Sequence, residues 1–138
     1  EGYMAPMEER EPLSRTNLAD LKKITEVCRK RGISLVLFSA PSPANWTMRR
    51  HNTIQDTAES LGLPYIDGNL LDLGIDWDTD TYDRGDHLNY SGAAKVTAWI
   101  GAYLRREAPG LTDRRGDPDY EIWDRDAAAF RARLEAQE

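Results

Sequence analysis

The sequence predicts an α/β fold in which helices alternate with parallel strands. Apolar residues recur at helical spacing over residues 18–31, 48–61 and 91–106. Two short apolar runs, residues 33–38 and 64–67, lie between these helices. The first run is almost continuously apolar, which is typical of a strand covered on both faces in a parallel sheet. The expected order is therefore helix, strand, helix, strand, helix.

Polar residues mark where the predicted helices begin. Asn17 is expected to cap the first helix, with Asp20 completing a weak capping box. Asn45 or Thr47 begins the second helix, and Ser91 caps the third. Two strands are too few for a stable sheet of the usual size, so an upstream segment or a second chain is expected to complete it.

The chain divides into three predicted parts. Residues 1–16 carry prolines, methionines and glutamates without periodicity and are expected to form an extended lead-in. Residues 17–106 form the α/β domain. Residues 107–138 form a tail with a charged surface helix over residues 120–134. A chain of 138 residues is long enough for one domain with a real core.

Composition excludes several classes of function. The formal net charge of -6 argues against binding to nucleic acid, which needs a basic surface, and against docking on anionic lipid. No apolar run reaches the eighteen or so residues of a membrane span. The single cysteine, Cys28, cannot form an internal disulfide or a cysteine-based zinc site. No cofactor is expected.

The residue best suited to chemistry is His87. Asp83 lies four residues before it, and Asp86 lies immediately before it. A catalytic base is often a histidine whose tautomer is fixed by an acid, and an acid on the same loop can do this without long-range folding. We interpret His87 as a catalytic base, Asp83 as its orienting acid and Asp86 as the alternate; a structural histidine is the other interpretation. His51 is expected to be a surface or helix-packing residue.

No serine of this chain stands in a sequence motif typical of a nucleophile, such as Gly-x-Ser-x-Gly. Ser39 and Ser42 follow the first predicted strand, at the edge where α/β sheets bind ligands, but neither has a glycine elbow. Ser42 is a candidate substrate-binding residue. Trp46 and Trp77 lie on predicted loops and are expected either to contact a sugar ring or acyl group, or to close the sheet edge as hydrophobic lids.

The acidic loop has part of the pattern of a calcium site. Asp76, Asp78 and Asp80 have the spacing of the first three acids of a calcium loop. Thr81 stands where that loop needs glycine, and His87 stands where it needs a bidentate glutamate. We therefore expect a solvated acidic loop and no metal ion.

Residues 82–93 resemble the C-terminal block of SGNH/GDSL-type hydrolases, in which an aspartate and a histidine on one loop complete a catalytic triad. Residues 35–42 resemble a later strand and proline-bearing loop of that family, and residues 54–67 resemble its next helix and strand. The tail over residues 111–123 is similar to that of an uncharacterised bacterial subgroup. The resemblance covers about residues 17–125.

The resemblance implies a partial three-layer α/β/α fold with parallel strands, the C-terminal part of the flavodoxin-like SGNH fold. It implies a serine esterase or acyl transferase acting on short acyl esters, such as those of surface carbohydrate, in an extracytoplasmic location. The family has its aspartate three residues before the histidine, where this chain has Arg84. Its serine block and oxyanion-hole glycine and asparagine are not recognisable here, so this chain is expected to be a C-terminal half whose nucleophile lies elsewhere. The alternative is a non-catalytic carbohydrate- or polyol-binding module that uses Trp46, Trp77 and the carboxylates.

Overall fold

The computed structural model describes residues 2–136 and combines helices with a parallel sheet, which confirms the predicted mixed α/β character. The elements in chain order are α1 (Arg15–Lys30), β1 (Leu37–Ser39), α2 (Met48–Ser60), β2 (Tyr65–Asp67), η1 (Gly68–Leu70), α3 (Tyr90–Glu107), η2 (Pro118–Tyr120) and α4 (Glu121–Glu135). The predicted lead-in and tail each extend outside the described residues, at residue 1 and residues 137–138.

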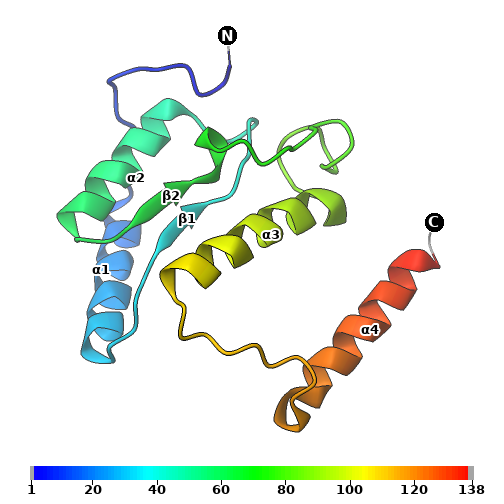
Figure 1. Cartoon of the computed structure of the whole chain (residues 1–138). Coiled ribbons are helices and arrows are strands. Elements are labelled where there is room, and N and C mark those ends of the chain that lie inside the picture. Colours follow the sequence, from blue (N-terminus) through cyan, green and yellow to red (C-terminus); the bar gives the residue numbers. More distant parts are fainter. Residues whose placement is uncertain (1, 137–138) are drawn as a thin grey trace. The chain divides into compact units, whose positions relative to one another are not determined.

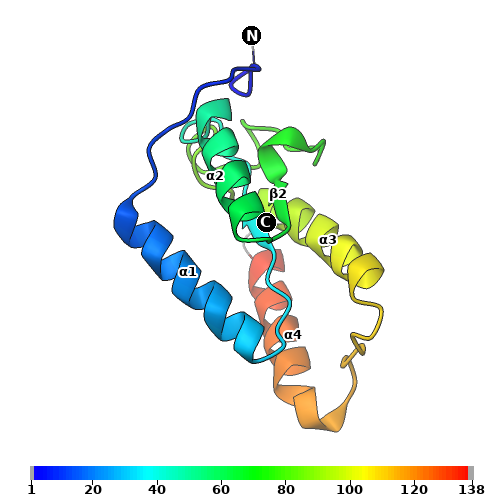
Figure 2. The same ribbon diagram turned by 90° about the vertical axis from the view of Figure 1, so that its left-hand side faces the viewer.

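Strands β1 and β2 pair in parallel, with α2 as the crossover between them. The register places Phe38 opposite Ile66 and Ser39 opposite Asp67. Helix α2 lies to one side of the two strands and α3 to the other (Figure 1), and the ring of Phe38 lies 6.1 Å from that of Trp99 on α3. Figure 2 shows α2 against β2 from the side. The last residues of both strands, Ser39 and Asp67, therefore meet at one edge of the sheet, where α/β folds place their ligands.

The first strand is shorter than the sequence predicts. A strand was expected over residues 33–38, but the ladder covers only Leu37–Ser39. The reason is the number of partners: β2 is the only strand paired with β1 in the described part of the chain, and β2 itself contributes three residues. The residues from 33 to 36 have no neighbouring strand with which to exchange backbone hydrogen bonds, and the side chain of Ile33 is exposed.

Helix α1 begins earlier than predicted. Its N-cap is Ser14, whose Oγ accepts a hydrogen bond from the backbone N–H of Asn17 at 3.4 Å. The prediction of Asn17 as the cap and Asp20 as part of a capping box is therefore wrong, because a serine hydroxyl satisfies the first-turn donors a turn earlier. Thr47 caps α2 as predicted, since its Oγ1 accepts from the N–H of Arg50.

The prediction of Ser91 as the cap of α3 is also wrong. Ser91 lies inside the helix, and its hydroxyl donates to the carboxylate of Asp80. Asn89 serves the helix start instead, because its Oδ1 accepts from the N–H of Gly92 at 3.2 Å. An asparagine side chain reaches the free N–H groups of the first turn as well as a serine does.

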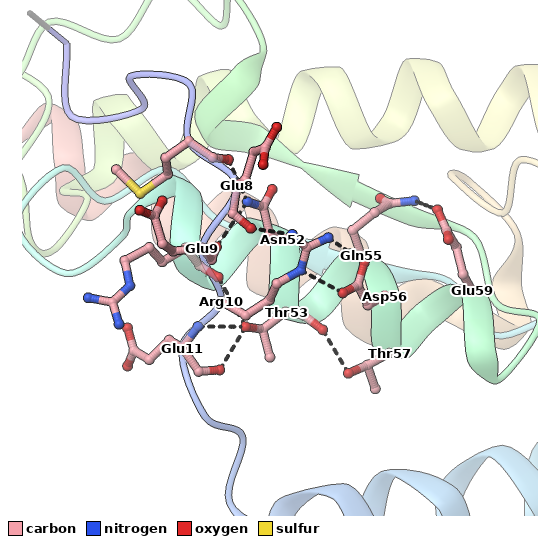
Figure 3. A network of polar contacts seen from close by, with 12 residues as sticks. Glu8, Glu9, Arg10, Glu11, Asn52, Thr53, Gln55, Asp56, Thr57 and Glu59 are labelled. Atoms are coloured by element: carbon pink, nitrogen blue, oxygen red, sulfur yellow. Dashed lines mark hydrogen bonds and ion pairs between the residues drawn. The ribbon is translucent and has the colours of Figure 1, made fainter.

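The lead-in is fastened along α2 despite having no helix or strand (Figure 3). The N–H of Glu11 donates to Oγ1 of Thr53 at 2.9 Å, and the same hydroxyl donates back to the carbonyl of Glu11 at 2.7 Å. Nδ2 of Asn52 donates to the carbonyl of Met7 at 2.8 Å. The lead-in pairs with no strand among the described residues, and these bonds to α2 satisfy part of its backbone hydrogen-bonding capacity instead.

Few apolar side chains are buried. Among the described residues the buried apolar side chains are Ala58 and Val96. Large apolar side chains that remain exposed include Ile24, Val27, Ile33, Leu104, Leu111, Ile122, Trp123 and Phe130. A chain of this length normally buries a much larger apolar core, so an unusually large part of its apolar side chains is exposed.

The chain forms two compact units, residues 1–101 and residues 102–138. In the second unit Asp117 caps η2 by accepting from the N–H of Asp119, and the carboxylate of Asp124 on α4 accepts from the N–H of Gly116. The guanidinium of Arg114 lies over the ring of Tyr120. None of the helices in the described part of the chain is long and apolar enough to cross a membrane.

Candidate functional site

The candidate histidine lies on a closed loop. Its ends are held by a bridge between Thr81 and Leu88 and by a bond from the N–H of Tyr82 to the carbonyl of His87 at 2.9 Å. Two consecutive residues, Arg84 and Gly85, have positive φ values of 57° and 123°. Such angles reverse the chain within a short span.

This reversal brings Asp83 to His87 over a spacing of four residues. Oδ2 of Asp83 lies 2.7 Å from Nδ1 of His87. Oδ1 of Asp83 accepts from the backbone N–H groups of Asp86 and His87 at 2.9 and 2.8 Å. The left-handed pair Arg84 and Gly85 lies within this spacing and closes the loop between the two side chains.

The alternate acid lies farther away. Oδ2 of Asp86 is 3.4 Å from Nδ1 of His87, and its other oxygen accepts from Nδ2 of Asn45. The geometry therefore assigns the bond to Nδ1 to Asp83. The side chain of His87 is 73% exposed, and its Nε2 makes no hydrogen bond within residues 2–136.

The two partners shift each other's protonation. The hydrogen bond to Asp83 and the nearby charge of Asp86 raise the pKa of His87. The bonds from the side chain and N–H of His87 hold the pKa of Asp83 below its usual range. Asp83 is therefore ionised at neutral pH, and its carboxylate accepts the Nδ1 proton, which leaves Nε2 as the basic nitrogen of the neutral ring.

A second loop supports the histidine loop. The N–H of Ala44 donates to the carbonyl of Gly85 at 3.1 Å, and Asn45 donates to Asp86. Gly85 is required here, because a Cβ on it would lie 2.7 Å from Cγ of Pro43. The proline-rich loop after β1 thus fixes the position of the loop that carries His87.

The acidic loop is anchored by a buried carboxylate rather than solvated. The side chain of Asp80 is 2% exposed and lies 2.5 Å from Nζ of Lys95. It also accepts from the hydroxyl of Ser91 and from the N–H of Asp76. Lys95, then Ser91, then the N–H of Asp76 lower the pKa of Asp80 to about 2. The expectation of a solvated loop is therefore wrong at Asp80, which ties the loop to α3.

The candidate serines are engaged elsewhere. Oγ of Ser42 donates to the carbonyls of Gly85 and Asp86 at 3.3 and 3.4 Å, and its N–H donates to Oδ1 of Asn69. Oγ of Ser39 lies 3.0 Å from the hydroxyl of Tyr65. Neither hydroxyl is bonded to His87 among the described residues. The structure thus brings Ser42 to the histidine loop without aligning it with the imidazole.

The two candidate tryptophans line different cavities. Trp46 lines a cavity of about 370 Å³ between the lead-in and α2. Trp77 lines one of about 130 Å³ near η1, and its ring meets that of Tyr3 edge to face at 6.3 Å. Both tryptophans are half-buried. The structure therefore does not place them in a shared pocket.

A second histidine–aspartate pair was missed from the sequence. Nδ1 of His51 lies 2.8 Å from Oδ2 of Asp67, whose side chain is 1% exposed. Trp46 donates to the same oxygen, and Asn69 donates its N–H and Nδ2 to Oδ1. Burial by itself raises the pKa of Asp67, but the bonds from Asn69, Trp46 and His51 outweigh it and lower that pKa.

The prediction of His51 as a surface or helix-packing residue did not include its pairing with Asp67. The first turn of α2 and the last residue of β2 lie at the same sheet edge, because α2 directly follows β1 and β1 is parallel to β2. This topological rule is the signal that could have paired His51 with Asp67. The carboxylate of Asp67 is bonded to side chains of Trp46, His51 and Asn69 and to the N–H of Asn69, so it holds the loop that carries Trp46 in place.

One cluster offers metal-ligand chemistry. One ligand atom each of Asp83, Asp86 and His87 lies within 4.8 Å of the others. Oxygen and imidazole nitrogen ligands of this kind suit zinc and similar divalent ions. Nδ1 of His87 is already bound to Asp83, so the arrangement is complete as an acid–imidazole pair without an ion.

Comparison with protein-family models, with curated proteins and with solved structures gave no match for this chain.

Proposed function

We propose that this chain supplies the acid–histidine half of a serine-dependent acyl hydrolase or acyl transferase of SGNH/GDSL type. The observation that supports the proposal is the pair of Asp83 and His87: a carboxylate 2.7 Å from Nδ1, and an exposed ring whose other nitrogen makes no hydrogen bond among the described residues. This is the arrangement that a catalytic base requires, because the acid fixes the tautomer and stabilises the imidazolium.

The reaction follows from those roles. Nε2 of His87 accepts the proton of a serine hydroxyl as that oxygen attacks the carbonyl carbon of a short acyl ester. The imidazolium then gives the proton to the departing alcohol, which leaves an acyl-serine. His87 next takes a proton from water, or from another hydroxyl, as that oxygen attacks the acyl carbon. It returns the proton to the serine oxygen as the acyl–serine bond breaks, which gives hydrolysis with water and transfer with another hydroxyl. Asp83 holds the ring throughout.

The serine comes from outside this chain in our proposal. Ser39 and Ser42 are bonded to other groups, and among the described residues each strand of the sheet is paired only with the other. The exposed Ile33 and the unpaired residues that follow it have the apolar composition of a covered strand. A further segment or a second chain would complete the three-layer α/β/α fold there and bring the nucleophile to His87.

The tautomer of His87 tests the proposal in this chain alone. Nitrogen chemical shifts of the neutral ring, recorded well above its pKa, should show the proton on Nδ1. Asp83→Asn should shift the population toward the proton on Nε2, while Asp86→Asn should leave it unchanged. A ring protonated mainly on Nε2 in the unaltered protein would remove His87 as a base.

Ester hydrolysis tests the proposal in the complete protein, meaning this chain together with the segment or second chain that supplies the serine. With a short-chain chromogenic ester, turnover should fall to background in His87→Ala and should rise with pH through the pKa of His87 in the unaltered protein. Turnover that survives His87→Ala would contradict the proposal.

A non-catalytic binding module is the second candidate. It is favoured by the engaged hydroxyls of Ser39 and Ser42 and by the cavity beside Trp46. In that case His87→Ala would leave ligand binding unchanged and no ester would be hydrolysed by the complete protein.

A further inference from the structure

The cavity beside Trp46 has the size and lining of a small-molecule site. Its volume of about 370 Å³ lies at the lower end of the roughly 300–1,000 Å³ typical of such sites. It opens between the lead-in, the N-terminus of α1 and the first turns of α2. The residues used below or forming its apolar wall are Glu11, Leu13, Asn17, Trp46, Arg50 and Ile54.

The walls of this cavity are held by bonds of their own. The lead-in is attached to α2 by the reciprocal bonds between Glu11 and Thr53, and by the bidentate contact of Arg10 with Asp56 at 2.8 and 3.2 Å (Figure 3). A site whose walls are already fixed loses little conformational entropy when a ligand enters.

The charged groups of the cavity cancel each other. Nε of Arg50 lies 3.1 and 3.0 Å from the two carboxylate oxygens of Glu11, and Nη1 of Arg50 donates to the carbonyl of Asn45. A charged ligand would have to compete with this pair for one of its members. A neutral ligand with both donors and acceptors can bond to the remaining lone pairs and N–H groups without breaking it.

Trp46 presents a ring of fixed orientation. Its Nε1–H donates to the buried carboxylate of Asp67 at 2.9 Å, and this hydrogen bond restricts rotation of the indole ring. The half-buried ring lines the cavity. A flat apolar surface beside neutralised polar groups matches a pyranose, which carries C–H groups on its faces and hydroxyls around its rim.

We propose that this cavity binds a neutral saccharide ring, stacked on Trp46 and hydrogen-bonded by Asn17, Glu11 and Arg50. Trp46 directly follows Asn45, whose side chain donates to Asp86 of the histidine loop. The idea that this saccharide carries the ester presented to His87 rests on the proposed function. The proposal that the cavity binds a saccharide is independent of the proposed function.

Titration with simple sugars, followed by nuclear magnetic resonance, tests the proposal. The probes are methyl β-glucoside and cellobiose, with glucuronate as the anionic counterpart. Both neutral probes should shift the indole N–H of Trp46 and the side-chain amide of Asn17 saturably, with a dissociation constant on the order of millimolar. Glucuronate should bind more weakly than methyl β-glucoside.

Variants separate the site from its surroundings. Trp46→Ala should weaken binding about tenfold or more, equal to the loss of one stacking contact. Asn17→Ala should also weaken it, and because this side chain is exposed and makes no hydrogen bond among the described residues, we expect the variant to fold normally. Trp77→Ala is the matched control and should bind normally.

His87→Ala should also bind the sugars normally, so failure of the catalytic proposal and failure of this one give different results. The proposal is overturned if neither neutral probe produces saturable shifts. It is also overturned if glucuronate binds more tightly than methyl β-glucoside, or if Trp77→Ala abolishes binding while Trp46→Ala and Asn17→Ala do not.

Discussion

Gly92, in the first turn of α3, allows the helix to approach the loop that carries the candidate histidine. A Cβ at this position would collide with the backbone carbonyl oxygen of Asp80 and would lie 3.0 Å from Cδ2 of Leu88. The carbonyl oxygen is backbone, so no rotamer change can move it away. We therefore expect Gly92→Ala to push α3 away from the loop and to destabilise the protein.

The magnitude follows from two opposing contributions. Alanine is favoured over glycine in a helix by about 1 kcal/mol. Forcing a methyl group into closely packed surroundings costs about 1–3 kcal/mol, and contact with a rigid backbone atom places this case at about 3 kcal/mol. The net loss is about 2 kcal/mol, which lowers the urea midpoint by about 1 M for an m-value of about 2 kcal/mol/M.

Urea unfolding followed by circular dichroism measures this loss. Gly110→Ala is the control, because a Cβ there has no heavy atom within 4 Å and the glycine has no positive φ. Its stability should change by less than about 0.5 kcal/mol. If Gly92→Ala is as stable as the unaltered protein or more stable, helix propensity decides at this position and the close approach of α3 to Asp80 is refuted.

Two further predictions concern pH. Because the pKa of Asp80 is lowered to about 2, its contacts stabilise the fold above its unfolded pKa of about 4 and are lost as pH falls toward 2. Asp80→Asn should therefore be less stable than the unaltered protein at pH 7, and in urea unfolding this difference in stability should shrink between pH 4 and pH 2. A difference that does not depend on pH would contradict the reasoning. Asp78→Asn, at an exposed position, is the control. Because the pKa of His87 is raised, its pairing stabilises the fold below about pH 6.5 and is lost as pH rises through the raised value. Asp83→Asn should lower that pKa more than Asp86→Asn does in an NMR titration, and the reverse order would assign the pairing to Asp86.

Local patterns in the sequence predicted what depends on neighbours along the chain. The helices follow from apolar spacing, and Asp83 and His87 pair because they lie four positions apart on one loop. The prediction failed where the deciding contact comes from farther away. His51 and Asp67 are joined by the parallel crossover, and Asp80 meets Lys95 only because α3 turns back along the loop.

Strand length failed for a related reason. The apolar run from residue 33 to 38 has the composition of a fully covered strand, but a strand forms only where another strand supplies its hydrogen bonds. In the described part of the chain β2 supplies them for three residues. The apolar composition therefore predicts a strand that is covered on both faces. The length of the observed strand is set by the hydrogen bonds that β2 supplies.

The fastening of the lead-in to α2 has a consequence for anything joined ahead of it. A linker that makes no contacts with its neighbours lets the two domains that it joins reorient, to a degree that its composition sets. Here the backbone is bonded to α2 at Met7 and again at Glu11. A domain joined ahead of Met7 would therefore be attached to backbone that is already held against α2. This attachment would restrict how that domain can be oriented relative to α2.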